Sequence, residues 1–571
     1  MKKRLLYLLF SCCLLCLMIF SLASCAAEED KWKPTGPLGE LPPQITWDTT
    51  DIVFQLTENT DSYNFSPTQR RFLAGDTDSL TPTDIDTYVK ARNTATYNDV
   101  MVNVIYNYCL NMADFGWGSN SDRIVRECAS GSPTAPDMYC NFVYDMTCAA
   151  LHGVFANLYS DDYGDGMNFF GFASARSTSG NVADSEGAYY LDYMRSLTLS
   201  NDRMYLLASD YNIDLLRSML VIPVNVSMLN SIPLEKSTGD TGELDGDFDI
   251  DDFYDLVWEG GFTYDALATL SEAVYKPLSD YNPGADLGDV IGFPLSHTPA
   301  SWQNGIFIAA GIDMLKKTPN GENGYSLSYP EKNDAFADFC ASLIDLLNSP
   351  GVCTVSRTHA MNFTEVALSN DRVIRNLFAS DNKILFGGIA SLGSLEGEKY
   401  RGMIENGTGL AIAPIPKYDN EGGESLAYHP AFDNSATVIA ISKKTGKFGQ
   451  CTAFLDCQTG RSTELVDYYA KEYFTLDKNN MTSLDKANVE MIKYLDGMVD
   501  SDVFDQAYDL IITNYFADVD GDLTYFGEWG RILSDFDYRI TDVQLFYEEV
   551  KLFKQDQLSH LIKIWNEKTE K

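Results

Sequence analysis

Stretches that favour strands alternate with stretches that favour helices along most of the chain. β-branched and aromatic residues dominate residues 51–56, 97–107 and 436–444, which we predict as strands. Residues 203–225 contain two apolar, strand-like runs around a polar centre, and residues 383–388 read as a strand that runs into a glycine turn. Apolar residues at helical spacing predict helices over residues 83–93, 122–129, 146–160, 248–277, 335–347, 448–458 and 541–565. This alternation is typical of α/β units with largely parallel sheets.

One interior strand has an abrupt end. Residues 409–423 read GLAIAPIPKYDNEGG, so an apolar run is followed by Pro414 and Pro416. Proline has no N–H to give to a sheet, and a central strand therefore cannot continue through these positions. We expect the chain to leave its sheet here.

The N-terminus has the pattern of a secretory signal peptide. Three basic residues at positions 2–4 precede an apolar run over residues 5–20, and small residues follow before Cys25. An uncleaved anchoring helix is the alternative, since about 18 apolar residues can just span a bilayer. The sequence LASC resembles the bacterial lipobox, which implies that residues 1–24 are removed and that Cys25 carries the lipid, palmitate included. Residues 25–47, rich in Pro and Gly, then form a semi-rigid tether.

The charge of the chain narrows the range of partners. The net charge is −40, from 82 acidic and 42 basic residues. Such a chain is repelled by phosphate polymers, which excludes nucleic acid as a partner.

The cysteines, histidines and acidic runs bear on disulfide bonds and metal binding. Eight of the 12 cysteines lie beyond Cys25, and they form either local disulfides, such as Cys128–Cys140 and Cys340–Cys353, or free buried thiols. The five histidines are too scattered for a local metal motif, so we expect no metal and no cofactor. Residues 245–252 and 518–528 are acidic, but they lack the Gly and Glu positions of an EF-hand loop and are interpreted as solvated loops, with a calcium site left open.

Four stretches, taken in order, resemble one protein family. They are ASGSPTAPDMY, LTLSNDRMYLLASDYN, LVWEGGFTYDALATLSEAV, and GLAIAPIPKYDNEGG followed by ATVIAISKKTGKFGQCTAFLDC. Together with the lipobox they resemble the extracellular solute-binding lipoproteins of bacterial ABC importers, in the large carbohydrate-binding group (family 1-like). The set covers most of the chain beyond Cys25, and no single stretch is specific alone.

The resemblance implies an α/β, two-lobed periplasmic-binding-protein-like fold (Venus flytrap) in which the chain crosses between lobes. The implied division is lobe 1 at 48–220, lobe 2 at 221–412, a return to lobe 1 at 413–460, and lobe 2 with C-terminal helices at 461–571. The crossings are expected near residues 218–225, 413–417 and 460. Leu410 and Val438 should therefore lie in different sheets.

Ligand contacts are expected where strands end at the cleft, as aromatic faces for sugar rings and planar polar groups for hydroxyls. Asp137 is expected to brace a strand. A solvated turn at residues 210–214 and a core position for the tryptophan at 302 are the alternatives. The candidate ligand-binding residues are Tyr139, Asn141, Tyr211, Asn212, Asp214, Arg217, Trp302, Gly388, Tyr428, Glu528 and Trp529.

The implied function is binding without chemistry. The protein would capture a carbohydrate or other small solute by hinge closure and deliver it to permease subunits, as a monomer anchored by lipid on the extracytoplasmic face of the cell membrane. A secreted surface glycoside hydrolase is one alternative, because a catalytic carboxylate pair is always possible among 82 acids. A glycan-adhesion protein that reuses the fold is another. The sequence has no nucleophile elbow, HExxH or P-loop motif, so we expect no enzyme.

Overall fold

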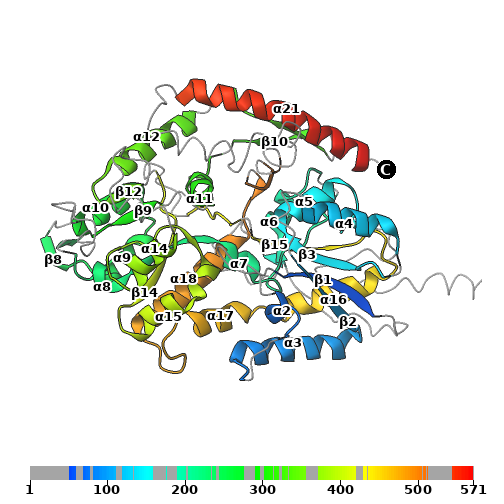
Figure 1. Ribbon diagram of the computed structural model, residues 1–571, viewed down its shortest axis with the longest axis horizontal. Helices are drawn as coiled ribbons and strands as arrows, with labels where there is room; N and C mark the ends of the chain where they lie inside the picture. The colour runs from blue at the N-terminus through cyan, green and yellow to red at the C-terminus, as the bar shows by residue number, and fades with distance from the viewer. Residues whose placement is uncertain are drawn as a thin grey trace, which may run out of the picture.

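The computed structural model places two α/β lobes side by side, with helices between and across them (Figure 1). It describes residues 51–569 apart from residues 59–68, 77–80, 111–118, 133, 159–174, 177–188, 201–202, 233–234, 239–242, 276–289, 296–300, 313, 321–323, 332–333, 355–370, 419–427, 434, 505, 509–510 and 512–542.

The first lobe is built on a four-stranded sheet in the order β15-β3-β1-β2. β1 pairs in parallel with β2 and β3, whereas β15 runs antiparallel to β3. β3 and β15 are buried along their whole length, as expected for strands covered on both faces. The strands are β1 (Ile52–Glu58), β2 (Val104–Leu110), β3 (Met138–Phe142) and β15 (Thr437–Ile441).

Helices cover this sheet on both sides (Figure 1). α3 packs against α16, α4 packs against α5, and α5 also contacts β15. The predicted start of α3 is confirmed, because Thr83 and Asp86 form a capping box there. The predicted strand from residue 97 is wrong over its first residues, since α3 continues to Val100, whose side chain is buried, and β2 starts only at Val104. The helices are α2 (Gln69–Phe72), α3 (Asp84–Val100), α4 (Ser119–Ser130), α5 (Val143–Leu151) and α16 (Phe448–Gly460).

The second lobe is built on a three-stranded antiparallel sheet in the order β13-β6-β14. Its elements are β6 (Leu220–Asn225), α8 (Val226–Leu229), α9 (Ile250–Trp258), α10 (Tyr264–Val274), α11 (Ser301–Ala309), α12 (Asp334–Asn348), α14 (Asp371–Ala379), β13 (Ala390–Ser391), the 3-10 helix η5 (Leu392–Glu396), α15 (Glu398–Glu405) and β14 (Leu410–Pro414). Small two-stranded sheets pair β4 (Ala175–Arg176) with β5 (Tyr189–Tyr190), β7 (Glu235–Thr238) with β8 (Glu243–Asp247), β9 (Phe293–Leu295) with β12 (Val352–Thr354), and β10 (Lys316–Asn320) with β11 (Gly324–Ser328).

The proline-ended strand differs from the expectation in one respect. β14 includes Pro414, which lies opposite Val221 of β6. Since β14 is at the edge of the described sheet, the missing N–H of Pro414 removes no hydrogen bond between strands. Val438 lies in the first lobe's sheet and Leu410 in the second lobe's, so the predicted separation of these two residues is confirmed.

The return to the first lobe occurs later than residues 413–417. Lys417 still exchanges backbone hydrogen bonds with Phe262 and Tyr264 of the second lobe. The return segment instead lies against the outgoing one: Leu220 N–H donates to Ala431 C=O at 2.8 Å, and Asp433 N–H donates to Ser218 C=O at 2.7 Å. Two antiparallel segments, 218–220 and 431–433, therefore join the lobes; we call them the paired crossing segments.

The C-terminal helices contact both lobes. α17 (Leu465–Tyr473) contacts α3 and α18, and α18 (Ser483–Val499) contacts β14 as well as α7 (Asp214–Ser218). Asp500, just after α18, accepts the N–H groups of Asp192 and Tyr193 at α6 (Leu191–Ser196). α21 (Val543–Thr569) lies across the top of Figure 1 and contacts both α5 and α12.

The cysteines that the structure describes are thiols. The predicted pair Cys128–Cys140 is wrong, because both cysteines are free and buried, and Cys340 is free as well; the side chain of Cys353 lies outside the described residues. The alternative of free thiols holds for Cys109, Cys128, Cys140, Cys148, Cys340, Cys451 and Cys457. None of the helices in the described part of the chain combines the length and the apolar character needed to traverse a bilayer.

Candidate ligand-binding site

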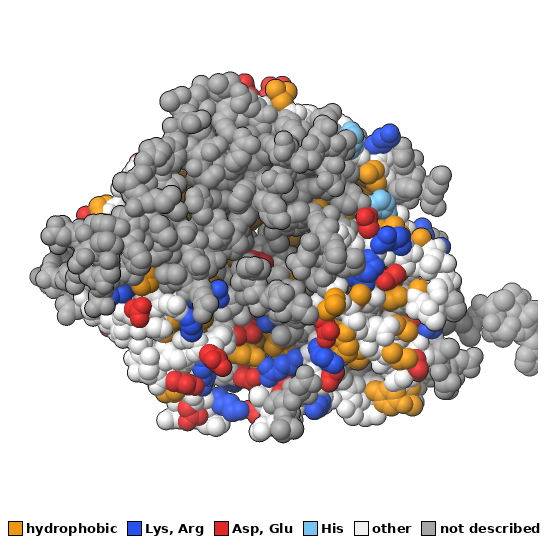
Figure 2. Space-filling model, in the orientation of Figure 1, with side chains coloured by type: hydrophobic (Ala, Val, Ile, Leu, Met, Phe, Trp, Pro, Cys, Tyr) orange, Lys and Arg blue, Asp and Glu red, His pale blue; other side chains and the backbone are white. Residues whose placement is uncertain are grey.

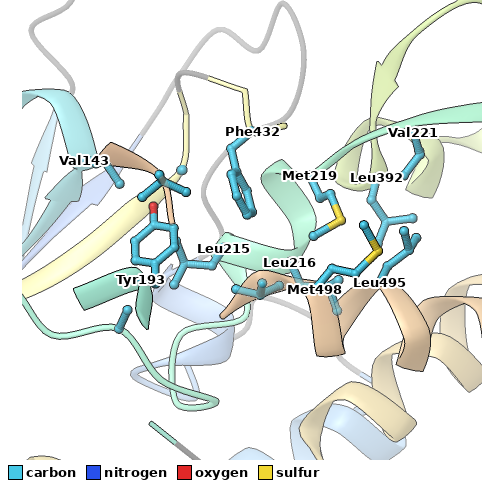
Figure 3. Close-up of a cluster of buried hydrophobic side chains, with 14 of the residues drawn as sticks. Val143, Tyr193, Leu215, Leu216, Met219, Val221, Leu392, Phe432, Leu495 and Met498 are labelled. Carbon is cyan, nitrogen blue, oxygen red and sulfur yellow. The ribbon is translucent and has the colours of Figure 1, made fainter. Parts of the chain in front are cut away.

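The junction of the lobes is packed with apolar side chains around α7 (Figure 3). Leu215 and Leu216 from α7 lie near Leu495 and Met498 from α18, and all four are buried. Phe432, from the return segment, packs its ring edge to face with Tyr193 at 5.7 Å. The paired crossing segments are therefore buried rather than exposed: Met219 and Phe432 belong to the main hydrophobic core, and Leu220 and Ala431 belong to a smaller apolar cluster.

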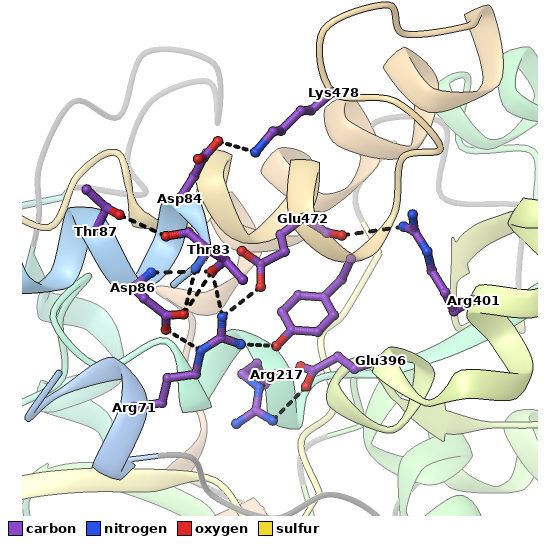
Figure 4. A network of polar contacts seen from close by, with 11 residues as sticks. Arg71, Thr83, Asp84, Asp86, Thr87, Arg217, Glu396, Arg401, Glu472 and Lys478 are labelled. Atoms are coloured by element: carbon purple, nitrogen blue, oxygen red, sulfur yellow. Dashed lines mark hydrogen bonds and ion pairs between the residues drawn. The ribbon is translucent and has the colours of Figure 1, made fainter. Parts of the chain in front are cut away.

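Arg217 is the centre of a buried polar network at this junction, and Figure 4 shows its ion pair with Glu396. Its side chain is 2% exposed and donates to Glu396 of η5 through Nε (2.7 Å) and Nη2 (3.0 Å), and to Asp214 through Nη1 (2.5 Å). Tyr469 of α17 also donates to Glu396, at 2.8 Å. Burial lowers the pKa of Arg217, but the two carboxylates outweigh it and hold the pKa above its usual value, so the guanidinium stays charged.

A second arginine holds α17 from the side of the first lobe. Arg71 of α2 donates to Asp86 (2.7 Å) and Glu472 (2.7 Å), and it also contacts Tyr473. Burial raises the pKa of Asp86, but its hydrogen bonds, first of all that from Arg71, bring the pKa below its usual value. From the second lobe, Arg401 of α15 donates to the carbonyl of residue 475 at 2.7 Å. The end of α17 is thus held by both lobes (Figure 4).

A hollow of about 770 Å³ lies beside this network, between the start of α3, α17 and α18. Its charges are largely paired: Asp467 binds Lys471 at 2.5 Å and Lys493 at 2.7 Å, and Asp84 binds Lys478. Its aromatic ring, Tyr468, is already stacked on Tyr88. The hollow therefore lacks the open aromatic face that sugar binding favours. Its lining residues are Asp84, Asp210, Thr463, Glu464, Val466, Asp467, Tyr468, Lys471, Glu472, Lys478, Asn479, Lys493 and Asp496.

The candidate residues on β3 and in the turn at residues 210–212 are all buried. Tyr139 packs against Phe155, and burial raises its pKa. Asn141 accepts the N–H of Phe142 at 2.7 Å. Tyr211 lies under the guanidinium of Arg92, at 4.8 Å from the ring centre.

Asn212 and Asp137 act as braces. The amide of Asn212 donates to the carbonyl of Thr437 at 2.8 Å and to its hydroxyl at 2.9 Å, which ties the turn to β15. Asp137 accepts from the N–H of Val53 at 2.8 Å and from Lys447 at 2.9 Å. The predicted bracing role of Asp137 is confirmed.

The remaining candidates belong to the second lobe and the C-terminal region. The hydroxyl of Tyr428 accepts from Phe262 N–H at 3.2 Å and donates to Val257 C=O at 2.9 Å, and burial raises its pKa. Gly388 has φ +80°, a conformation that favours glycine. Trp302 lies on α11, but its side chain is outside the described residues, as are Glu528, Trp529 and Cys25 in full. Ligand contacts by all these residues, Asp214 and Arg217 included, stay predictions.

The network contains residues that the sequence did not single out. Glu396 lies 179 positions from Arg217, and Tyr469 and Arg71 are also far from it in sequence, so no local motif joins them. One signal was available: Arg217 follows Leu215 and Leu216 and precedes a continuous apolar run, and a cation in such a run needs a buried acidic partner.

The acidic runs have a structural use where they are described. Asp249 caps α9 by accepting the N–H groups of Asp251 and Asp252. In the described part of the chain, no three His, Cys, Asp or Glu side chains are grouped so that they could hold a metal ion. Residues 518–528 lie outside that part.

No protein-family model and no curated protein matches the sequence. Solved structures that are similar include the GacH receptor of Streptomyces glaucescens, solved unliganded and with acarbose (13% identity, TM-score 0.44, 90% of this chain and 99% of that chain). The sugar-binding protein MalE from Xanthomonas citri is similar at 10% identity and TM-score 0.46 (90% and 99%), and an extracellular solute-binding protein of family 1 from Alicyclobacillus acidocaldarius at 12% and 0.46 (90% and 98%).

Proposed function

We propose that this chain is the lipid-anchored extracellular solute-binding subunit of an ABC importer, which captures a small solute, most simply an oligosaccharide, by closing two lobes around it. In this proposal the protein does no chemistry and hands the unchanged solute to permease subunits.

The observation that carries the proposal is the pair of crossing segments. Two lobes with separate sheets are joined at residues 218–220 and 431–433, which are hydrogen bonded to each other. A hinge of this kind lets a few backbone angles absorb a rotation of one lobe against the other. A solute that touches both lobes binds the closed arrangement more tightly and shifts the population towards it.

The anchor and the location are supported by the sequence alone. A basic start, an apolar run and LASC end at Cys25, and the net charge of −40 suits a soluble body held near a surface by a lipid. Replacing Cys25→Ser should release the protein from the membrane fraction. A mass spectrum of membrane-bound protein that still begins at an unmodified Met1 would contradict this part of the proposal.

Calorimetry against a panel of linear gluco-, galacto- and manno-oligosaccharides tests the binding role, with chromatography of the recovered sugar. The proposal expects saturable binding of at least one sugar, which is recovered unchanged. Trp529→Ala should weaken that binding about tenfold, the loss of roughly 1.4 kcal/mol of ring stacking. Trp258→Ala is the matched control, because Trp258 is already packed between Tyr254 and Tyr494 on the second lobe. Steady release of shortened products would favour the hydrolase alternative.

A further inference from the structure

The long helix α21 begins on the second lobe and ends on the first (Figure 1). It contacts α12 and β11 of the second lobe, and the ammonium of Lys551, in its first half, donates to the carbonyl of Glu331 at 3.2 Å. On the first lobe it contacts α5, and Trp565 packs against Tyr205 with the ring centres 6.3 Å apart. Tyr205 belongs to the first lobe, because Leu207, two residues later, exchanges backbone hydrogen bonds with β15.

The part of α21 between these two attachments is a stiff connection. Lys551 and Trp565 lie about 21 Å apart along the helix, at about 1.5 Å per residue. Residues 551–565 contain no proline or glycine, the residues at which helices most often kink. The helix therefore fixes the distance between its two attachments. A rotation of the lobes about the paired crossing segments has to break one of them.

A second connection between the lobes lies beside α21. β10 and β11 form a hairpin of the second lobe, and β11 contacts α21. The ammonium of Lys317 on β10 donates to the carbonyls of Arg195 and Thr198, at 3.4 and 3.2 Å, and lies 4.7 Å from the ring centre of Phe504. A hydrogen bond is lost beyond about 3.5 Å, so a separation of about 1 Å at this point would break both.

The carbonyls that Lys317 binds belong to the first lobe. Arg195 lies in α6, which directly follows β5. Tyr190 of β5 donates its N–H to the carbonyl of Ala208 at 3.1 Å, and the neighbouring Leu207 is hydrogen bonded to β15. The hairpin therefore connects the same two lobes as α21.

These connections and the polar network around α17 lie on opposite sides of the lobe junction. In Figure 1, α21 and β10 lie above α7, and α17 lies below it. On the lower side, Figure 2 shows acidic and basic side chains gathered over α15 and α17. The two lobes are thus held by charged side chains on one side, and by α21 with the hairpin on the other.

We propose that α21 and the β10–β11 hairpin form a strap that holds the two lobes in the arrangement of the structure, and that the C-terminal end of α21 leaves the first lobe when the lobes separate. Trp565 lies close to the end of the helix at Thr569, and helix ends open at a low free-energy cost. The other attachment, at Lys551, lies further inside the helix and beside the hairpin, so it stays in place.

The strap has a consequence for a solute held between the lobes: it slows both entry and release. This consequence rests on the proposed function, whereas the strap itself does not. A distance between the lobes that is measured without any solute therefore tests the strap separately from solute binding.

Pulsed electron paramagnetic resonance on the full chain measures this distance. Nitroxide labels are attached to p-acetylphenylalanine at two exposed positions, Arg126 of α4 and Ala341 of α12, so that the native cysteines are not labelled. The strap predicts a narrow distance distribution. Trp565→Ala should raise the share of longer distances at least about threefold, the scale of one lost aromatic contact. Leu552→Ala, at a 71% exposed position of the same helix, is the matched control and should change nothing.

A pair of lysine variants tests the hairpin in the same way. Lys317→Met keeps most of the side-chain length but removes the donor to the first lobe, so longer distances should appear. Lys316→Met makes the same chemical change at the exposed neighbouring position of β10 and should leave the distribution unchanged.

Equal distributions for Trp565→Ala and Leu552→Ala would overturn the strap. If Trp565→Ala unfolds the chain, as far-UV circular dichroism would show, the lysine pair decides instead, and equal distributions for Lys317→Met and Lys316→Met would overturn the strap. A chain that binds no sugar of the panel, yet shows the expected longer distances, would contradict the proposed function and support the strap.

Discussion

Replacing Glu396→Gln should destabilise the junction strongly, because it removes half of the charge that compensates Arg217. The guanidinium is 2% exposed and makes two hydrogen bonds to this carboxylate, at 2.7 and 3.0 Å. Glutamine keeps the shape of the side chain, but it places an NH2 donor where one carboxylate oxygen accepted, and only Asp214 then balances the buried cation. Breaking a buried ion pair by removing one partner costs about 3–5 kcal/mol. Glu396 is partly accessible, so we expect the lower end, about 3 kcal/mol.

Urea unfolding followed by far-UV circular dichroism measures this cost, as a lower midpoint at an unchanged slope. The matched control is Glu405→Gln, which makes the same chemical change in the same lobe. Glu405 is exposed and pairs with Arg401 four residues earlier on α15. Such pairs contribute about 0.3–0.5 kcal/mol, so the control should shift the midpoint only slightly.

A double-mutant cycle separates the ion pair from other effects of the change. If Arg217→Met is made first, Glu396→Gln should lose most of its effect, because the cation that Glu396 binds is already gone. Two results would refute the reasoning: a loss of stability from Glu396→Gln no larger than that from Glu405→Gln, or effects of Arg217→Met and Glu396→Gln that simply add.

Two further predictions concern the interior of each lobe. Burial raises the pKa of Asp145 to about 6, although hydrogen bonds from Asn120 and from the N–H of Ser121 lower it in part. The protonated carboxyl therefore stabilises the fold at pH values below the unfolded pKa, and this stabilisation is lost as the pH rises through 6. Between about pH 4 and 7 the free energy of unfolding should fall by up to about 3 kcal/mol because of this group, and Asp145→Asn should abolish that fall. Urea midpoints at each pH measure it, and a pH profile that Asp145→Asn leaves unchanged would contradict the prediction. A Cβ at Gly292 would lie 2.2 Å from the Cα of Ser271, so Gly292→Ala should lower the free energy of unfolding by about 3 kcal/mol. A Cβ at Gly402, in α15, would have no atom within 4 Å, so Gly402→Ala should be neutral or stabilising. Thermal unfolding measures both effects. Equal melting temperatures for the two alanine variants would contradict the packing.

Local signals predicted many of the elements. Thr83 caps α3 and Thr263 caps α10, because a side-chain oxygen followed by apolar residues at helical spacing defines a helix start without help from the rest of the fold. The strand at residues 51–56 and the strand around Val438 have β-branched and apolar residues that suit a sheet buried on both faces, and both appear as β1 and β15.

Non-local packing decided what sequence patterns left ambiguous. The strand-like prediction for residues 203–225 is wrong around Leu215, where the chain forms the helix α7. The side chains of α7 pack against α18, which follows more than 260 positions later in the sequence. The strand expected at residues 383–388 is reduced to isolated bridges at Ile384 and Phe386. The proline at 414 predicts a strand end, but it stays within β14 because this strand lies at the edge of the described sheet.

The candidate site, too, could not be predicted from local sequence patterns alone. Aromatic and amide residues near strand ends are predicted to contact a ligand, but Tyr211 and Asn212 have partners inside the protein. The interlobe network depends on Glu396 and Tyr469, which reach Arg217 only through the fold. Residue type and local order identify groups able to bind a sugar, but burial, which follows from tertiary packing, decides which of them are available.

Small-angle X-ray scattering of the full chain, with and without the tightest-binding sugar of the panel at saturation, tests solute capture by lobe closure most directly. Closure about residues 218–220 and 431–433 predicts a smaller radius of gyration and a shorter maximum dimension when the sugar is bound. An identical scattering curve at full saturation would contradict capture by closure of the two lobes.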